Sequence, residues 1–180
     1  MGMEVIKVET RTKLDGSRMG RPIMSEDAAG GDEGKWPDMQ PIFHGINRNK
    51  LGFTIDLKQP KARNIIEQLI KVTDIVLDNS APGAMARLSL DHKSLQAIKP
   101  DIISISLTGC GESGPLRDAL VYAPLIIAHG GLQSIIGYPG EDTPMQVMFG
   151  YGDCNASIHA VFAVLSALWH REKTGEGQHI

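Results

Sequence analysis

Short apolar runs typical of buried strands alternate with helix-like segments along this chain, and this alternation constrains the fold more than any other feature. Two such runs cover residues 74–78 and 102–107, and each leads into a turn of polar or small residues. Apolar residues recur at helical spacing over residues 60–70, and residues 90–98 resemble a short helix. Strands that alternate with helices form parallel βα units. We therefore expect an α/β fold with a doubly wound, mostly parallel sheet, whose ligands bind beyond the carboxyl ends of the strands.

The rest of the chain supplies further elements and one long loop. Residues 10–45 are rich in Gly, Pro, Asp and charge and show no helical or strand period, so we expect a flexible loop there. Residues 177–180 resemble the start of another extended segment. We also expect strands over residues 5–9 and 49–57, and helices over residues 123–129 and 154–173, the last one capped by Gly175.

Composition excludes several classes of protein. The chain has 180 residues, of which 42% are hydrophobic, and a formal net charge of −3. This length and hydrophobic content suffice for a core, and the near-neutral charge argues against a nucleic-acid partner. The longest apolar run, residues 160–169, is shorter than the roughly 20 residues that span a bilayer. With no secretory signal pattern and only two cysteines, we expect a cytoplasmic protein without a membrane partner.

A glycine pattern follows the apolar run at residues 102–107. Residues 109–114 match G-x-G-x-x-G, the fingerprint of dinucleotide-binding folds. That fingerprint must also open a helix, because the helix amides bind the pyrophosphate. Pro115 and a charged stretch follow instead. A tight glycine turn that lines a pocket is therefore the better interpretation.

The cysteine and histidine residues do not indicate a cysteine nucleophile or a metal site. Cys154 and His159 lie five positions apart on one expected helix, which turns their side chains about 140° away from each other. Cys110 has no assigned partner. The six histidines show no spacing typical of metal ligands, so we expect no metal.

Asp153 is the acidic residue that we consider for a structural or a catalytic role, because it lies between glycines and the start of the longest expected helix. Sequence pattern alone favours a helix N-cap, whose carboxylate accepts hydrogen bonds from unpaired amides. A chemical role is also open. An aspartate carboxylate is ionised at pH 7, so it can attack an activated acyl group without a partner base.

Several motifs, taken in order, resemble the class III CoA transferases, the family that also includes α-methylacyl-CoA racemases. The resemblance covers nearly the whole chain, and it implies a Rossmann-like fold that forms part of the large CoA-binding domain. The motifs that carry it are residues 2–9, 47–50, 55–58, 78–79 with 82–83, 106–109, 150–153 and 173–178.

The resemblance implies a reaction and a set of site residues. Asp153 matches the nucleophile that attacks a donor acyl-CoA and forms a mixed anhydride, which CoA converts to an aspartyl-CoA thioester. An acceptor carboxylate then takes the CoA. CoA, as part of the acyl-CoA substrate, is the cofactor implied, and a homodimer is the assembly implied. The residues that match the CoA site of the family are Ile55, Lys58, Asn79, Ser80, Arg87 and Tyr122.

The chain also departs from the family pattern. Ser80 and Cys110 replace aromatic residues, which bears on substrate identity. The family has a βα unit before Val5 and a small domain after Ile180. We therefore expect residues 1–180 to be a partial large domain, truncated at both ends.

Three functional hypotheses follow. The first is CoA transfer through Asp153. The second is an α-methylacyl-CoA racemase, against which Tyr122 counts, because a phenol is a poor base at neutral pH where the racemases have a histidine. The third is a fragment that binds CoA without catalysis.

Overall fold

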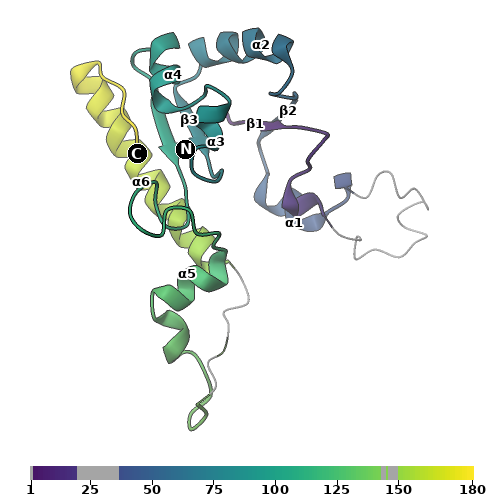
Figure 1. Ribbon diagram of the computed structural model, residues 1–180, viewed down its shortest axis with the longest axis vertical. Coiled ribbons are helices and arrows are strands. Elements are labelled where there is room, and N and C mark those ends of the chain that lie inside the picture. The colour runs from purple at the N-terminus through teal and green to yellow at the C-terminus, as the bar shows by residue number, and fades with distance from the viewer. Residues whose placement is uncertain (1, 20–36, 143–144, 146–149) are drawn as a thin grey trace. The chain divides into compact units, whose positions relative to one another are not determined.

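The computed structural model describes residues 2–19, 37–142, 145 and 150–180. Its described elements are β1 (Ile6–Glu9), a 3-10 turn η1 (Gly16–Arg18), α1 (Pro41–Ile46), β2 (Leu51–Thr54), α2 (Pro60–Lys71), β3 (Ile75–Asp78), α3 (Ala84–Arg87), α4 (His92–Ile98), β4 (Ile103–Ser106), α5 (Ala123–His129), a 3-10 turn η3 (Leu132–Ile135) and α6 (Tyr151–Thr174) (Figure 1). The chain divides into two compact units, Met1–Ile65 and Ile66–Ile180. Each unit contains a pair of parallel strands, so the expected α/β fold with parallel pairing is confirmed.

The first unit pairs β1 with β2 in parallel, with Ile6 opposite Leu51. The segment after β1 returns to it through ion pairs: Lys7 contacts Asp15 at 2.6 Å, and the Arg18 guanidinium binds both oxygens of Glu9 at 2.9 and 3.0 Å. Burial raises the pKa of Asp15, but hydrogen bonds from Lys7 and Ser17 outweigh it and lower that pKa to about 2.

The expected loop over residues 10–45 is shorter than predicted at its C-terminal end. Helix α1 begins at Pro41, a residue well suited to a first helical turn, and buries Phe43. The Arg18 guanidinium lies 3.4 Å from the centre of the Phe43 ring. This cation–π contact joins residues 25 positions apart in the sequence, so local periodicity did not reveal the helix. Residues 20–36 of the predicted loop lie outside the described residues.

The second unit pairs β3 with β4 in parallel, with Asp78 opposite Ser106. Residues 178–180 lie along the other edge of β4, where the Ser104 N–H donates to Gln178 O and the Ile180 N–H donates to Ser104 O, each at 2.9 Å. The expected extended segment at residues 177–180 is therefore confirmed. Gly177 makes this approach possible, because a Cβ there would collide with the carbonyl oxygen of Ile102.

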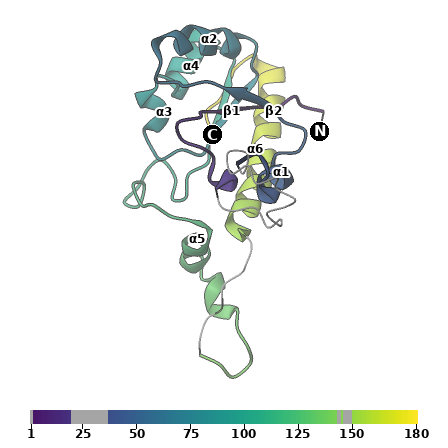
Figure 2. The same ribbon diagram turned by 90° about the vertical axis from the view of Figure 1, so that its right-hand side faces the viewer.

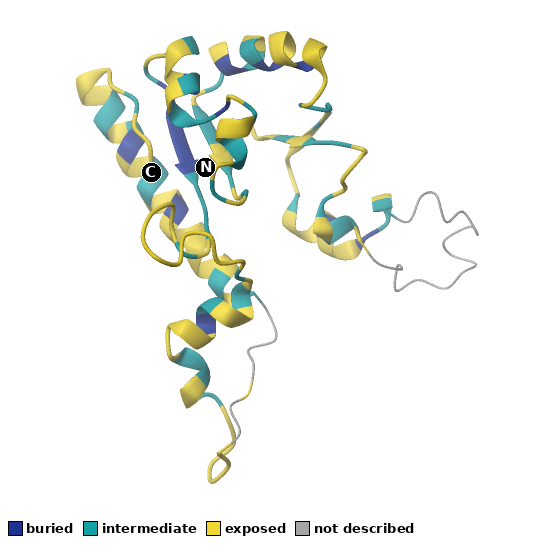
Figure 3. Ribbon diagram, viewed as in Figure 1, coloured by how far each residue is buried: buried dark blue, intermediate teal, exposed yellow. Residues whose placement is uncertain are grey.

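The core of the second unit centres on β4, where Figure 3 shows buried residues gathered along the strand. Ile102, Ile103 and Ile105 are at most 2% exposed, and Leu95 of α4 is 1% exposed. Helix α6 runs beside β4 in both views (Figures 1 and 2). Its buried residues include the small Ala160 and Ala167, seven positions apart and so on one face of the helix.

Candidate functional site

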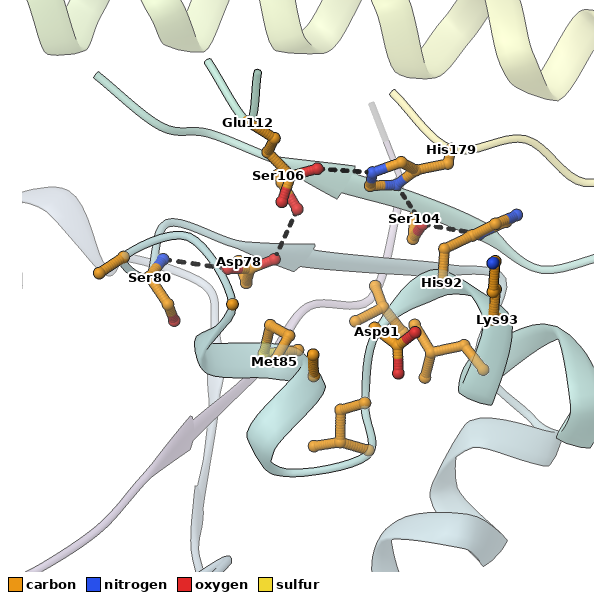
Figure 4. Close-up of a pocket in the computed structure, with 16 residues that line it drawn as sticks. Asp78, Ser80, Met85, Asp91, His92, Lys93, Ser104, Ser106, Glu112 and His179 are labelled. Atoms are coloured by element: carbon orange, nitrogen blue, oxygen red, sulfur yellow. Dashed lines mark hydrogen bonds and ion pairs between the residues drawn. The ribbon is translucent and has the colours of Figure 1, made fainter. Parts of the chain in front are cut away.

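Two polar groups lie at the carboxyl ends of the parallel strands. Asp78 ends β3, and its carboxylate accepts hydrogen bonds from Ser106 Oγ of β4 at 2.9 Å and from the Ser80 N–H at 3.0 Å (Figure 4). These bonds join the two strands and fix the turn at residues 79–80. The predicted residues Asn79 and Ser80 are therefore presented from the strand end where α/β folds bind ligands.

Arg87 belongs to the same part of the unit. It lies at the end of α3, which follows that turn, and its side chain is exposed. The guanidinium folds over Gly83, where a Cβ would lie 3.5 Å from Nη1. No carboxylate pairs with it among the described residues. This arginine can therefore contact an anionic ligand without first breaking an ion pair.

Asp153 lies in the first turn of α6, two residues inside the helix, so the prediction that it caps the helix is wrong. The N-cap is Gly150, and α6 begins at Tyr151, three residues earlier than expected. The Asp153 carboxylate folds back over Gly150, where a Cβ would collide with Oδ2. In the described part of the chain no hydrogen bond or ion pair occupies this exposed carboxylate, although Ser157 Oγ donates to the backbone oxygen of Asp153 at 2.7 Å.

Tyr122 lies near Asp153 because the first turns of α5 and α6 pack together. Tyr122 is the N-cap residue of α5, and its side chain is 79% exposed. A Cβ on Gly152 would lie 3.6 Å from Ala123 Cα and 3.7 Å from Ile126 Cβ. The close approach of these turns brings the residue after Tyr122 against the residue before Asp153.

The loop after β4 also reaches the region in front of α5. A Cβ on Gly109 would collide with Val121 Cγ2, so the two ends of the segment between β4 and α5 are in contact. Residue 109 after β4 thus contacts residue 121 before α5, and the start of α5 contacts the start of α6. Asp153 lies beside these contacts, in the first turn of α6.

The predicted residues Ile55 and Lys58 follow β2. Ile55 is half-buried and its N–H donates to Glu9 O at 2.8 Å, whereas the Lys58 side chain is exposed. The Lys58 N–H donates to Asp56 Oδ1 at 3.0 Å. Both residues belong to the first compact unit, and Asn79, Ser80, Arg87, Tyr122 and Asp153 belong to the second.

The glycine turn at residues 109–114 does not start a helix, as the sequence indicated. Gly111 and Gly114 have φ values of +81° and +90°, which favour glycine, and the next helix is α5 at Ala123. Cys154 and His159 both lie on α6, and the His159 ring bonds Asn155 O rather than a thiol.

No helix among the described residues is long and apolar enough to cross a membrane. In the same part of the chain, no group of three or more His, Cys, Asp or Glu side chains is arranged to hold a metal ion.

Sequence reasoning missed a polar network on one face of β4. Here a cavity of about 360 Å³ is lined by residues that include Asp78, Ser80, His92, Ser104 and His179 (Figure 4). The serines at positions 104 and 106 alternate with isoleucines in a segment predicted to be an apolar strand. That alternation is the signal that could have revealed a polar face on β4.

Comparison with known proteins gives a consistent result. The sequence matches CoA-transferase family III over residues 1–180. It is 33% identical over 180 residues to a succinate–glutarate CoA-transferase of Agrobacterium fabrum, covering 100% of this chain and 44% of that protein. It is 34% identical to a succinyl-CoA–D-citramalate CoA-transferase of Chloroflexus aurantiacus, covering 98% of this chain and 41% of the relative.

A solved structure supports the same relationship. The crystal structure of a CaiB/BaiF family protein from Brucella suis matches with a TM-score of 0.85 and 32% identity, covering 98% of this chain and 44% of that chain. The chain therefore spans less than half the length of the relatives it matches.

Proposed function

The chain belongs to CoA-transferase family III, and from that premise we propose that it transfers CoA from an acyl-CoA donor to a carboxylic acid, with Asp153 as the nucleophile. The observation that carries the proposal is the position of Asp153: an exposed carboxylate in the first turn of a 24-residue helix, without a hydrogen-bond partner among the described residues. The positive end of a helix dipole stabilises an anionic side chain. A carboxylate held there is charged and accessible to a substrate.

The proposed chemistry begins with attack of an Asp153 oxygen on the thioester carbonyl of the donor. The carbon–sulfur bond breaks, CoA leaves as the thiolate, and a mixed anhydride remains. The thiolate then attacks the aspartyl carbon of the anhydride, which releases the donor acid and leaves an aspartyl-CoA thioester. The acceptor carboxylate repeats the two exchanges in reverse order, so it departs as its CoA ester and Asp153 is regenerated.

The glycines beside Asp153 support this role. Gly150 and Gly152 carry no side chains, so the acyl group can approach the carboxylate closely. The backbone amides of the first turn of α6 have no partner inside the helix, and such amides stabilise an oxyanion.

Other residues fit the binding of CoA. The Lys58 and Arg87 side chains are both exposed and have no ion-pair partner among the described residues, so their charges are available to the CoA phosphates. Asn79 and Ser80, on the turn fixed by Asp78, offer hydrogen bonds to the pantetheine arm. Ile55 offers an apolar contact, and Tyr122 lies beside the nucleophile turn.

Assembly and location remain predictions. We propose a homodimer in the cytoplasm, with acyl-CoA and carboxylic acid substrates. The named substrates of the relatives point to dicarboxylic acids such as succinate. The absence of a histidine at position 122 favours transfer over racemisation.

The test is an isotope exchange that requires no knowledge of the natural acceptor. The protein is incubated with succinyl-CoA and carbon-13-labelled succinate, and label entering succinyl-CoA is measured by mass spectrometry. We expect exchange in the wild type and none in Asp153→Asn, with the exposed Asp142→Asn variant as the matched control. CoA binding without exchange would favour the non-catalytic fragment, and deuterium uptake at the α-carbon of a methyl-branched acyl-CoA would favour a racemase.

A further inference from the structure

Residues 108–121 lie between β4 and α5, and among the described residues one hydrogen bond connects them to the rest of the unit. Within the described chain, the bond that leaves this segment joins Glu112 Oε2 to His179 Nε2 at 2.9 Å. The other hydrogen bonds of the segment are local, such as Arg117 to Asp118. We refer to residues 108–121 as the β4–α5 loop. The partner of Glu112 in this hydrogen bond is a histidine, the side chain whose charge ordinarily changes between pH 5 and 8.

His179 also belongs to a chain of hydrogen bonds. Its Nδ1 lies 2.8 Å from Ser104 Oγ, which lies 2.9 Å from His92 Nδ1 (Figure 4). The two imidazole rings stack with centroids 5.2 Å apart. The serine hydroxyl has one proton, so it can donate to only one of the two rings.

The single proton of the Ser104 hydroxyl determines how protons are arranged along this chain of hydrogen bonds. When His179 is neutral, Nε2–H donates to Glu112, and Nδ1 accepts the Ser104 proton. When His179 is protonated, both of its nitrogens donate, and Ser104 turns its proton toward His92 Nδ1. The contact with Glu112 then becomes a charge-assisted bond, which is stronger than the neutral one.

The two imidazole rings differ in the groups that surround them. Burial lowers the pKa of His92, the nearby His179 lowers it further, and Asp91 opposes both effects. His179 instead faces the carboxylate of Glu112. The other charged groups that line the cavity are Asp78 from β3 and Lys93 from α4, and Asp78 is already bonded to Ser106 and Ser80.

We propose that His179 is a protonation-controlled anchor of the β4–α5 loop, which it holds more tightly when its imidazole is charged and pairs with Glu112. The loop ends at Val121, directly before Tyr122, and Val121 contacts the other end of the loop at Gly109. Release of the anchor is expected to loosen residues 110–118, the part of the loop between these two contacting ends, which leads to Tyr122. The link to Tyr122 and Asp153 matters for catalysis only through the proposed function, whereas the anchor itself does not depend on it.

The test measures hydrogen–deuterium exchange of residues 110–118 in the 180-residue chain, without CoA or turnover. Exchange rates at pH 5.5 and pH 8.0 are divided by the intrinsic rates at each pH. We expect about two- to fivefold greater protection at pH 5.5, the range of an exposed ion pair, because His179 and Glu112 are 36% and 47% exposed. Glu112→Gln and His179→Gln should abolish the difference, and the matched control Glu141→Gln should keep it.

Two results would overturn the anchor. The first is equal protection of the wild-type loop at the two pH values. The second is a pH-dependent difference in protection that persists in Glu112→Gln. High salt gives a second wild-type readout, because the extra protection at pH 5.5 should shrink in 1 M sodium chloride if it arises from an ion pair. Because none of these measurements involves CoA, they test the anchor independently of the proposed function.

Discussion

Arg171 connects the end of α6 to the loops before β3 and β4, so its removal should loosen the helix that carries Asp153. Its Nη2 donates to Asp74 Oδ1 at 2.9 Å, and its Nη1 reaches the carbonyl oxygens of Asp74 and Asp101 at 3.5 and 3.4 Å. The arginine side chain is 17% exposed, but that of Asp74 is 65% exposed, so solvent screens the pair. We expect a coupling free energy of about 0.5–1 kcal/mol between the two side chains, the upper part of the range for exposed pairs.

A double-mutant cycle of Arg171→Met and Asp74→Asn measures this coupling by urea denaturation followed by circular dichroism. The hydrogen bond from Arg171 lowers the pKa of Asp74, burial opposes it, and Lys99 lowers it further. A carboxyl whose pKa is lowered in the folded state stabilises the fold above its ordinary pKa of 3.8, and that contribution is lost as pH falls through the folded value. The coupling should therefore be present at pH 7 and decline toward pH 3.

The matched control is Lys173→Met, since Lys173 lies in the same last turn and contacts the Trp169 ring of its own helix. It should change the free energy of unfolding by less than about 0.5 kcal/mol. A coupling near zero at pH 7, or one that is unchanged at pH 3, would refute this account of how α6 is held.

Three further changes test the packing and electrostatics of the two units. Gly177→Ala should destabilise the second unit by more than about 1 kcal/mol, because its Cβ meets the Ile102 carbonyl oxygen, whereas Gly45→Ala, which has open space, should be neutral or slightly stabilising in urea denaturation. Leu95→Ala, at a side chain 1% exposed, should cost about 2–5 kcal/mol, and a smaller cost would mean that the core around β4 can collapse. The pKa of Asp15 is lowered from 3.8 to about 2, so Asp15→Asn should remove at most about 2 kcal/mol of folding stability. In the wild type this contribution is present above pH 4 and is lost between pH 4 and 2. If the free energy of unfolding of Asp15→Asn has the same pH profile as that of the wild type, the role given to Asp15 is wrong.

Sequence pattern predicted the elements whose burial is periodic. Apolar residues at positions 62, 66 and 70 are spaced four apart, and they are the buried face of α2. The helix expected over residues 123–129 has those bounds in the structure. Helix α1 escaped prediction because its buried residue, Phe43, contacts the distant Arg18, which no local window contains.

The site was predictable in its parts but not in its arrangement. Family resemblance singled out Asp153, but local pattern made it a helix cap, and the chain uses Gly150 for that purpose. The network around Ser104 joins residues 12 and 75 positions away in the sequence. Contacts at that separation depend on how β4 and the last residues of the chain pair, which composition and periodicity do not specify.

Trapping the acyl or CoA adduct on Asp153 tests most directly whether this residue is the nucleophile. The protein is incubated with succinyl-CoA, quenched with hydroxylamine, digested and sequenced by mass spectrometry. If Asp153 is the nucleophile, its side chain is recovered as a hydroxamate in the wild type, the Asp142→Asn control gives the same adduct, and Asp153→Asn gives none. CoA transfer that continues in Asp153→Asn, with Asp153 unmodified in the wild type, would contradict the claim.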